Sequence, residues 1–525
     1  MKRLRGMFAF ALWDVPRRTL MLARDRLGIK PLYYTHQHGH VVFASELKAL
    51  LQHPVVERRL NLEGVDSYVT YGYIPAPQTP FMEIQKLPPA TLLTVQAGRV
   101  SQERYWTLSY TTKLTVTFEE AAEGFTAHLR DAVRSHLVSD VPLGAFLSGG
   151  MDSSTVVALM SQVSGRAVKT FSIGYEGGGD ELRYARMVAA RFGTDHHELV
   201  VHPNLADLLP ELVWWQDEPF FDNSMLPTYA IARFARPHVT VALSGDGGDE
   251  LLGGYEWTRR HQMVRLLARV PQPLREGMRR LLLGQRFVPG YESDGLSRVR
   301  RLLYDSACSL EEGFARRTTV SPTFRAQLYT EDLKRQLQGY DARQIQQVAF
   351  AEAQVSEARE AMLYVDTMLF LPDDCLFKVD RMSMANALEV RVPFLDHEVV
   401  EYASHLPFAH KVAGLTTKRL LKRAMRAALP SVILRQRKQG FTLPIARWLR
   451  GELGAVMERI VLGETALRRG LWNPAFVRHM FEAHRRGRHD FSGRLWSLAI
   501  FELWARFYLD EIRSTKPAVN LRALA

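Results

Sequence analysis

Short apolar stretches separated by turn-forming residues make up roughly the first 110 residues of the chain. The stretches are residues 8–13, 20–23, 32–34, 41–44 and 91–95. Gln37-His38-Gly39 and Gln96-Ala97-Gly98 have the composition of hairpin turns. Five prolines between residues 75 and 89 rule out a regular helix in that section. The pattern therefore predicts a β-rich N-terminal region.

From about residue 115 the pattern changes to alternating helices and strands. Strands are predicted at residues 141–147, 168–173 and 239–243, and helices at residues 122–137, 154–163 and 182–192. Strands separated by helices indicate a parallel sheet that is covered on both faces. Ligands of such sheets bind beyond the carboxyl ends of the strands. Beyond about residue 255 the chain is predicted to be mostly helical.

Length and charge indicate how many domains to expect and which partners to exclude. A chain of 525 residues suggests two or three domains. The net charge of +12 owes much to arginines between residues 259 and 301 that alternate with leucines. Such spacing is typical of amphipathic helices with a solvated basic face, so no nucleic-acid partner is expected. No apolar run reaches the roughly 18 residues of a membrane span, and we expect a cytoplasmic protein. A homodimer is left open.

The two cysteines, Cys308 and Cys375, do not form a disulfide framework, and we expect both to be buried thiols. CxxC pairs and HExxH motifs, which would suggest zinc, do not occur.

The strongest chemical signal is Ser148-Gly149-Gly150-Met151-Asp152-Ser153, which lies between a predicted strand and a predicted helix. The two glycines let the backbone approach a ligand closely, and N–H groups at a helix start point at an anion. Asp152 can bind a magnesium ion, and the serine hydroxyls can donate hydrogen bonds. A Walker A sequence is absent. The loop therefore predicts a phosphate site of another type.

This hexapeptide resembles the SGGxDS loop of the PP-loop ATP pyrophosphatases, which release pyrophosphate and adenylate their substrate. Residues 244–255, 380–384 with 389–396, and 437–444 resemble further blocks of the asparagine synthetase family. Residues 6–11, 23–34 and 43–50 resemble the latter part of that family's glutaminase domain. The chain is thus identified as a member of the glutamine-hydrolysing asparagine synthetase family, truncated at the N-terminus.

The resemblance implies an α/β fold in two parts. Residues 1–112 would be a β-rich remnant of an N-terminal-nucleophile, class II glutamine amidotransferase domain that lacks the half with the nucleophile. Residues 113–515 would be the synthetase domain, with a parallel sheet of the PP-loop type and a helical C-terminal region.

The same resemblance implies which residues bind ATP and Mg²⁺. Residues placed beside the nucleotide are Leu147, Ser148, Gly149, Gly150, Asp152, Ser153, Ile173, Ser244 and Gly245. Asp152 and Asp249 would hold the Mg²⁺ ion.

Three residues are implied to act in catalysis. Asp246 stands where many relatives carry glutamate, at a position linked to forming the adenylate. Lys438 would neutralise charge on the leaving pyrophosphate. Glu389 would shape the substrate pocket, or would instead be structural and pair with Arg391 or Arg381.

Weaker candidates have structural alternatives of equal standing. Lys378 and Asp380 belong either to the site or to the scaffold. Asn223 or Ser224 could contact an amino acid, whereas Asp222 or Ser224 could simply cap a helix.

The implied reaction is conversion of aspartate to asparagine through a β-aspartyl-adenylate, with release of AMP and pyrophosphate. The nitrogen comes from glutamine in the intact family. Position 2 is Lys2 and the first cysteine is Cys308, so ammonia is the expected donor here. The alternatives are amidation of another carboxylate, such as a uronic acid in a cell-surface polysaccharide, and an inactive ATP-binding fragment. The β-lactam-forming relatives carry tyrosine at the position of Asp246, which argues against β-lactam closure.

Overall fold

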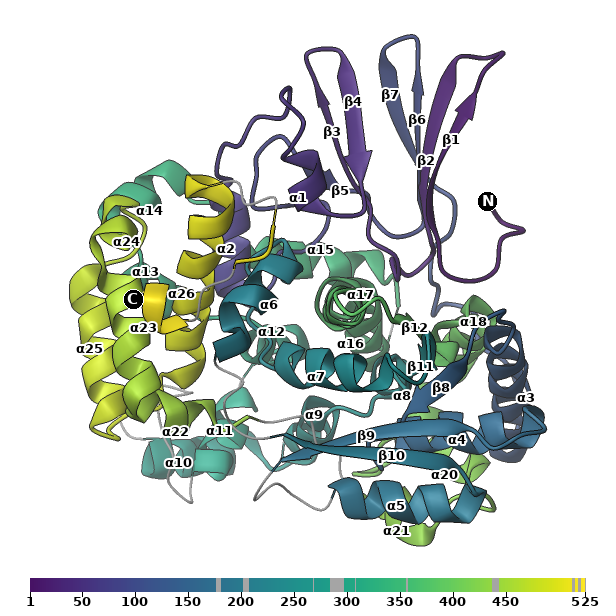
Figure 1. Cartoon of the computed structure of the whole chain (residues 1–525). Coiled ribbons are helices and arrows are strands. Elements are labelled where there is room, and N and C mark those ends of the chain that lie inside the picture. Colours follow the sequence, from purple (N-terminus) through teal and green to yellow (C-terminus); the bar gives the residue numbers. More distant parts are fainter. Residues whose placement is uncertain are drawn as a thin grey trace.

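The computed structural model describes most of the chain. The described residues are 1–175, 181–201, 207–267, 269–283, 297–306, 308–355, 357–436, 443–511, 515–517 and 521–524. The hairpins of the N-terminal region stand together at one end of the molecule, the parallel sheet lies below them, and the C-terminal helices lie at the left side of the view (Figure 1).

The N-terminal region contains two antiparallel sheets, as the hydrophobic pattern predicts. One sheet has the order β1-β2-β6-β7 and the other the order β4-β3-β5. The strands are β1 (Ala9–Asp14), β2 (Thr19–Arg24), β3 (Tyr33–Gln37), β4 (His40–Ala44), β5 (Gln85–Lys86), β6 (Thr91–Gln96) and β7 (Arg99–Arg104). Both predicted hairpin turns are confirmed, with His38, Gly39, Ala97 and Gly98 at positive φ. The pattern missed α2 (Leu62–Tyr71), which ends at Gly72 with φ +90°.

The second part of the chain is built on a five-stranded sheet of order β10-β9-β8-β11-β12. Its strands are β8 (Leu143–Phe146), β9 (Lys169–Tyr175), β10 (Asp195–Val201), β11 (Val241–Leu243) and β12 (Glu389–Arg391). All neighbouring strands are parallel. The three predicted strands are confirmed, whereas β10 and β12 were not predicted.

Helices cover both faces of this sheet, as expected. They are α3 (Phe118–His136), α4 (Met151–Val163), α5 (Glu181–Phe192) and α7 (Met225–Ala235). On one face α3, α4 and α5 pack against Ala145, Leu147 and Leu243. On the other face, α7 packs against Phe171 and Ala242.

The remaining helices form the covering and C-terminal layers. They are α1 (Leu47–Leu50), α6 (Leu209–Gln216), α8 (Gly248–Leu252), α9 (Glu256–Leu267), α10 (Gln272–Leu283), α11 (Ser297–Asp305), α12 (Leu310–Thr318), α13 (Pro322–Leu328), α14 (Glu331–Leu337), α15 (Arg343–Glu352), α16 (Ala358–Val365), η2 (Asp366–Leu376), α17 (Phe377–Met384), η3 (Pro393–Leu395), α18 (His397–His405), α19 (Phe408–Lys411), α20 (Arg419–Ala424), α21 (Ser431–Arg435), α22 (Ile445–Arg450), α23 (Glu452–Leu462), α24 (Glu464–Arg468), α25 (Pro474–Arg485), α26 (Ser492–Ala505), η4 (Arg506–Asp510) and η5 (Leu521–Leu524).

The N-terminal region shares a hydrophobic core with the C-terminal helices. The ring of Phe81 lies 5.7 Å from that of Trp504 on α26, and the hydroxyl of Tyr68 donates to the carbonyl of Ser497 at 2.8 Å. Both contacts join the section between β4 and β6 to α26. The section therefore holds the N-terminal sheets firmly against the rest of the molecule. None of the helices in the described part of the chain combines the length and hydropathy that a bilayer crossing requires.

Candidate active site

The first glycine-rich loop joins β8 to α4 through a turn that only glycine fits easily. Gly149 has φ +72°, and a Cβ there would lie 2.6 Å from the amide nitrogen of Ala185. Helix α4 begins directly after Gly150. The hydroxyls of Ser148 and Ser153 lie 3.0 Å apart, so they brace the loop across the helix start. This geometry leaves helix N–H groups directed at the space in front of the loop.

The second glycine-rich loop follows β11 and touches the first. A Cβ at Gly245 would lie 2.7 Å from the amide nitrogen of Ser153, so the two loops are in close contact. Gly247 has φ +93° and precedes α8. The hydroxyl of Ser244 donates to the Asp246 carboxylate at 2.6 Å, which fixes the direction of that carboxylate.

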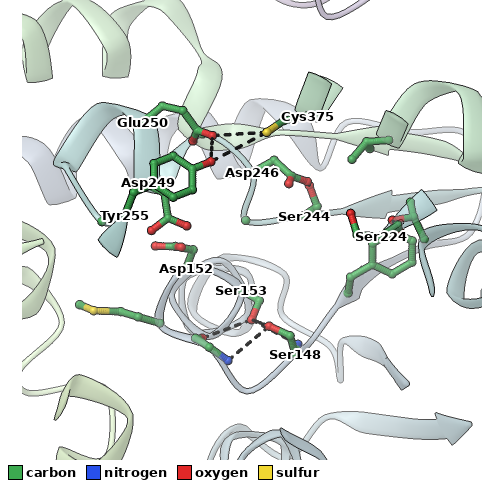
Figure 2. A pocket seen from close by; sticks show the side chains of 18 of the residues that line it. Ser148, Asp152, Ser153, Ser224, Ser244, Asp246, Asp249, Glu250, Tyr255 and Cys375 are labelled. Carbon is green, nitrogen blue, oxygen red and sulfur yellow. Dashed lines mark hydrogen bonds between the residues drawn. The ribbon is translucent and has the colours of Figure 1, made fainter. Parts of the chain in front are cut away.

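A cavity of about 420 Å³ opens between the two loops, beyond the carboxyl ends of β8 and β11 (Figure 2). The sequence-predicted residues that line it are Leu147, Ser148, Gly150, Asp152, Ser153, Ile173, Ser244, Gly245, Asp246 and Asp249. Gly149 shapes the loop behind this lining. The cavity therefore lies where ligands of parallel sheets bind, and its volume suits a nucleotide.

Of the three predicted catalytic residues, Glu389 is not part of this lining. Glu389 pairs in register with Val241, the first residue of β11, and so lies near the amino ends of the strands. Its carboxylate accepts a hydrogen bond from Arg391 Nε at 2.6 Å. The structure thus places Glu389 away from the cavity, in the structural pair that was its alternative. Lys438 lies outside the described residues.

The carboxylates of Asp152 and Asp249 face one another across the cavity floor (Figure 2). Lys418 Nζ forms ion pairs with both of them, and its distance to Asp249 Oδ1 is 2.5 Å. A Cβ at Gly254 would collide with Asp249 and with the Lys418 side chain, so this glycine makes the arrangement possible. Lys418 lies outside all of the sequence motifs. Two oxygen ligands beside a phosphate site fit Mg²⁺, which usually takes one or two carboxylates and completes its shell with phosphate oxygens and water.

A wall opposite the first loop carries a second polar cluster (Figure 2). The hydroxyl of Tyr255 donates to Glu250, and Cys375 Sγ lies 3.6 Å from the same Glu250 oxygen. Burial raises the pKa of Cys375 and of Tyr255 well above their usual values. The Cys375 thiol is therefore neutral at physiological pH and is no activated nucleophile. Cys375 and Cys308 are half-buried, so the expectation that both are buried is only partly met.

The same wall holds an ion pair between Lys378 and Asp222, and both residues line the cavity. Lys378 Nζ lies 2.6 Å from Asp222 Oδ2. Ser224 donates to Asp222 through its amide nitrogen at 2.9 Å and its hydroxyl at 2.7 Å. Burial opposes ionisation of Asp222, but Lys378 and Ser224 outweigh it and hold the pKa of Asp222 below its usual value. Burial raises the pKa of the neighbouring Asp374 well above its usual value, so this carboxyl is neutral.

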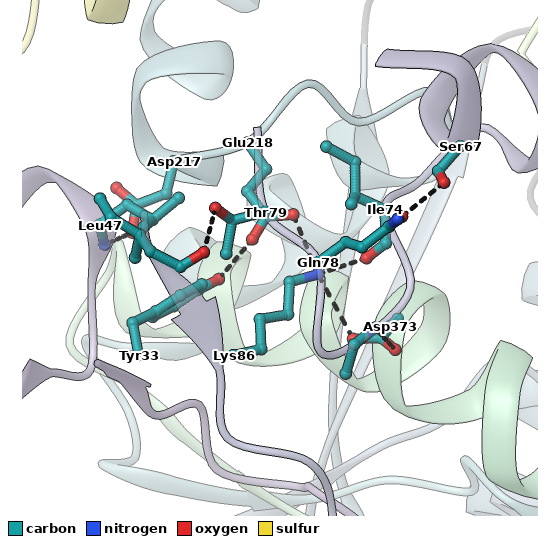
Figure 3. A network of polar contacts seen from close by, with 12 residues as sticks. Tyr33, Leu47, Ser67, Ile74, Gln78, Thr79, Lys86, Asp217, Glu218 and Asp373 are labelled. Atoms are coloured by element: carbon teal, nitrogen blue, oxygen red, sulfur yellow. Dashed lines mark hydrogen bonds and ion pairs between the residues drawn. The ribbon is translucent and has the colours of Figure 1, made fainter. Parts of the chain in front are cut away.

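The segment that carries Asp222 is anchored by the N-terminal region (Figure 3). Lys86 Nζ lies 2.9 Å from Glu218 Oε2 and 3.4 Å from Asp373 Oδ1. The hydroxyl of Tyr33 donates to Glu218 Oε1 at 2.9 Å, and the amide of Ala76 donates to Asp373 at 2.8 Å. Lys86, Glu218 and Asp373 are buried. The N-terminal region therefore holds two segments, at Glu218 and at Asp373, that lead directly into the cavity wall.

A second set of contacts fixes the neighbouring residue. Asp217 has φ +66° and is fully buried. Lys48 Nζ lies 2.6 Å from its Oδ1, and the amide of Leu47 donates to its Oδ2 at 2.8 Å. Lys30 pairs with Asp380 at 2.9 Å, so Asp380 belongs to the interface and not to the cavity.

Both parts of the chain are similar to known protein families. Residues 1–106 match the model of a glutamine amidotransferase domain, and residues 124–506 match the model of asparagine synthase. Asparagine synthetase [glutamine-hydrolyzing] 1 of Bacillus subtilis is 33% identical over 97% of this chain and 78% of its own length. Asparagine synthetase [glutamine-hydrolyzing] 3 of the same organism is 31% identical over 85% of this chain and 70% of its own length.

A more distant relative is Amidase chyE of Penicillium rubens, which is 27% identical over 90% of this chain and 74% of its own length. The asparagine synthase model spans well over half of the chain, and the first relative is similar along almost all of it. The chain therefore belongs to the asparagine synthase family of ligases and carries an amidotransferase domain before its synthase domain.

Proposed function

We propose that this protein forms asparagine from aspartate with ATP, through a β-aspartyl-adenylate, and releases AMP and pyrophosphate. One observation carries the proposal: two glycine-rich loops meet at the carboxyl ends of β8 and β11, around the facing carboxylates of Asp152 and Asp249. Two of the three named relatives, both from Bacillus subtilis, are asparagine synthetases, which supports aspartate as the acceptor.

ATP would lie along the first loop, with its phosphates at the start of α4. The backbone of Gly150 and the hydroxyls of Ser148 and Ser153 supply the donors for phosphate oxygens. Ile173, at the wall formed by β9, would lie beside adenine. This arrangement directs the α-phosphate toward the second loop.

Positive charge at the phosphates would come from three sources. Asp152 and Asp249 would hold Mg²⁺, which neutralises phosphate charge when bound. Lys418 already lies between these carboxylates, and Lys438 is the second lysine in the proposal. Their charge stabilises the pyrophosphate as it leaves. Asp246, held by the Ser244 hydroxyl, would orient the groups that form the adenylate.

We propose ammonia as the nitrogen donor of the 525-residue polypeptide. No cysteine occurs in residues 1–106, which match the amidotransferase model, because the two cysteines are Cys308 and Cys375. Residues 1–106 therefore offer no thiolate to attack the glutamine amide.

The first test is exchange of labelled pyrophosphate into ATP with a panel of carboxylates. We expect Mg²⁺-dependent exchange with aspartate. Exchange only with uronic acids would favour the rival acceptor, and ATP binding without any exchange would favour an inactive fragment. Ammonium and glutamine are then supplied separately: asparagine should form with ammonium, and release of glutamate from glutamine would contradict the proposed donor.

A further inference from the structure

We propose that the Asp222–Lys378 pair is the subsite for the head group of an α-amino-acid acceptor. The Lys378 ammonium binds the acceptor's α-carboxylate, and the Asp222 carboxylate binds its α-ammonium. This inference rests on the proposed function, because it assumes that the cavity activates a carboxylate with ATP. It adds the residues that recognise the part of the acceptor that does not react.

The pair is charged and open to the cavity. The side chains of Lys378 and Asp222 are 13% and 26% exposed, and both residues line the cavity. Hydrogen bonds from Ser224 and the ion pair itself keep the pKa of Asp222 low despite burial, so the carboxylate is ionised. A ligand in the cavity therefore meets one fixed negative and one fixed positive charge, side by side.

Such a pair is poorly explained by stability alone. The free-energy cost of removing two charges from water often exceeds what their attraction returns. Apolar side chains can therefore often replace a buried ion pair without loss of stability. Of the three hydrogens on Lys378 Nζ, the described contacts use one, in the bond to Asp222. The other two N–H groups can donate to a second carboxylate. An amino-acid zwitterion laid antiparallel to the pair would give four alternating charges.

The pair also discriminates between acceptors. A uronic acid has one carboxylate, which reacts, and no ammonium group. Its binding would shield Asp222 and Lys378 from water and give neither a new partner of opposite charge. A site built around a polar group rejects analogues that lack the group far more strongly than an apolar pocket rejects a missing methylene. The charges of this wall therefore favour amino acids over sugar acids.

The test uses two acceptors that each lack one part of the aspartate head group. Succinate lacks the α-ammonium, and β-alanine lacks the α-carboxylate. Wild-type pyrophosphate exchange should be about 10²-fold less efficient with either than with aspartate, the scale of one charged hydrogen bond. Asp222→Asn should lower kcat/KM for aspartate by about 10²-fold and leave the succinate value within about twofold. Lys378→Met should do the same, with β-alanine as the unaffected acceptor.

Asp380→Asn is the matched control, because Asp380 lies on the same helix and pairs with Lys30 outside the cavity lining. It should leave the ratio between aspartate and succinate unchanged. The double variant Asp222→Asn/Lys378→Met removes both charges together, so it avoids an uncompensated charge if a single variant fails to fold. Equal losses for aspartate and succinate in Asp222→Asn, or wild-type exchange that is as efficient with succinate, would overturn the subsite. If none of the carboxylates supports pyrophosphate exchange, the proposed function is overturned as well.

Discussion

Removing the Lys86 ammonium should destabilise the interface between the N-terminal region and the synthase domain. Lys86→Met leaves Glu218 and Asp373 buried without their shared cation. Breaking one buried pair typically costs about 3–5 kcal/mol. Glu218 keeps the Tyr33 hydroxyl and Asp373 keeps the Ala76 amide, so we expect a loss of about 3 kcal/mol and not the sum of two pairs.

The loss of stability caused by Lys86→Met should depend on pH. Burial raises the pKa of Glu218, and Lys86 partly offsets this rise. Without Lys86 this pKa rises further. The folded variant then holds a proton that the unfolded chain releases above its own pKa of about 4.5, so the variant loses stability as pH rises. The difference in free energy of unfolding between wild type and variant, measured by urea denaturation, should be small at about pH 5 and should reach its full size at about pH 8.

Lys30→Met is the matched control for this experiment. Its pair with Asp380 crosses the same interface, but the Lys30 side chain is 22% exposed. We therefore expect a loss of about 1 kcal/mol or less, with little dependence on pH. If Lys86→Met costs no more stability than Lys30→Met, or if its cost is the same at both pH values, Lys86 does not neutralise the two buried carboxylates.

The remaining predictions concern single side chains. Asp152→Asn should abolish most pyrophosphate exchange because the metal loses a charged ligand, and wild-type exchange rates in this variant would contradict the metal site. Lys438→Ala should lower kcat by roughly 10²-fold while ATP binding persists, whereas a variant that turns over like the parent would remove Lys438 from the mechanism. Lys418→Met should tighten Mn²⁺ binding to the free protein about tenfold, because the Lys418 ammonium competes with the metal for the two carboxylates. Electron paramagnetic resonance measures this binding, and weaker binding in the variant would contradict the competition. Burial lowers the pKa of Lys411 to about 7, so the wild type should gain stability as pH rises from about 7 toward 10. Lys411→Met should lose this gain, and a parallel pH profile would count against it.

The sequence predicts the outline of the fold because that outline depends on local patterns. The turn at Gln37-His38-Gly39, the strand before Ser148 and the helix after it each follow from neighbouring residues. Strand β12 has three residues and no period that a pattern could reveal. Its place beside β11 comes from a part of the chain that is distant in sequence.

The residues of the candidate site likewise fall into those that the sequence could reveal and those that it could not. Motifs located both glycine-rich loops, because each loop is one continuous segment. The partners of Asp152 and Asp222 could not be found in that way, since Lys418 and Lys378 lie 266 and 156 residues away. The sequence could not place Glu389 for a related reason. Its motif is recognisable, but the end of the sheet at which Glu389 lies depends on strand register.

Transfer of oxygen from the carboxylate to the nucleotide shows whether an acyl-adenylate forms. Aspartate labelled with ¹⁸O in its side-chain carboxylate is incubated with the protein, MgATP and ammonium, and the nucleotide products are analysed by mass spectrometry. Attack of the carboxylate on the α-phosphate of ATP predicts one labelled oxygen in each AMP, together with unlabelled pyrophosphate. Label in inorganic phosphate, with ADP as the nucleotide product, would contradict the adenylate and with it the role proposed for the two loops.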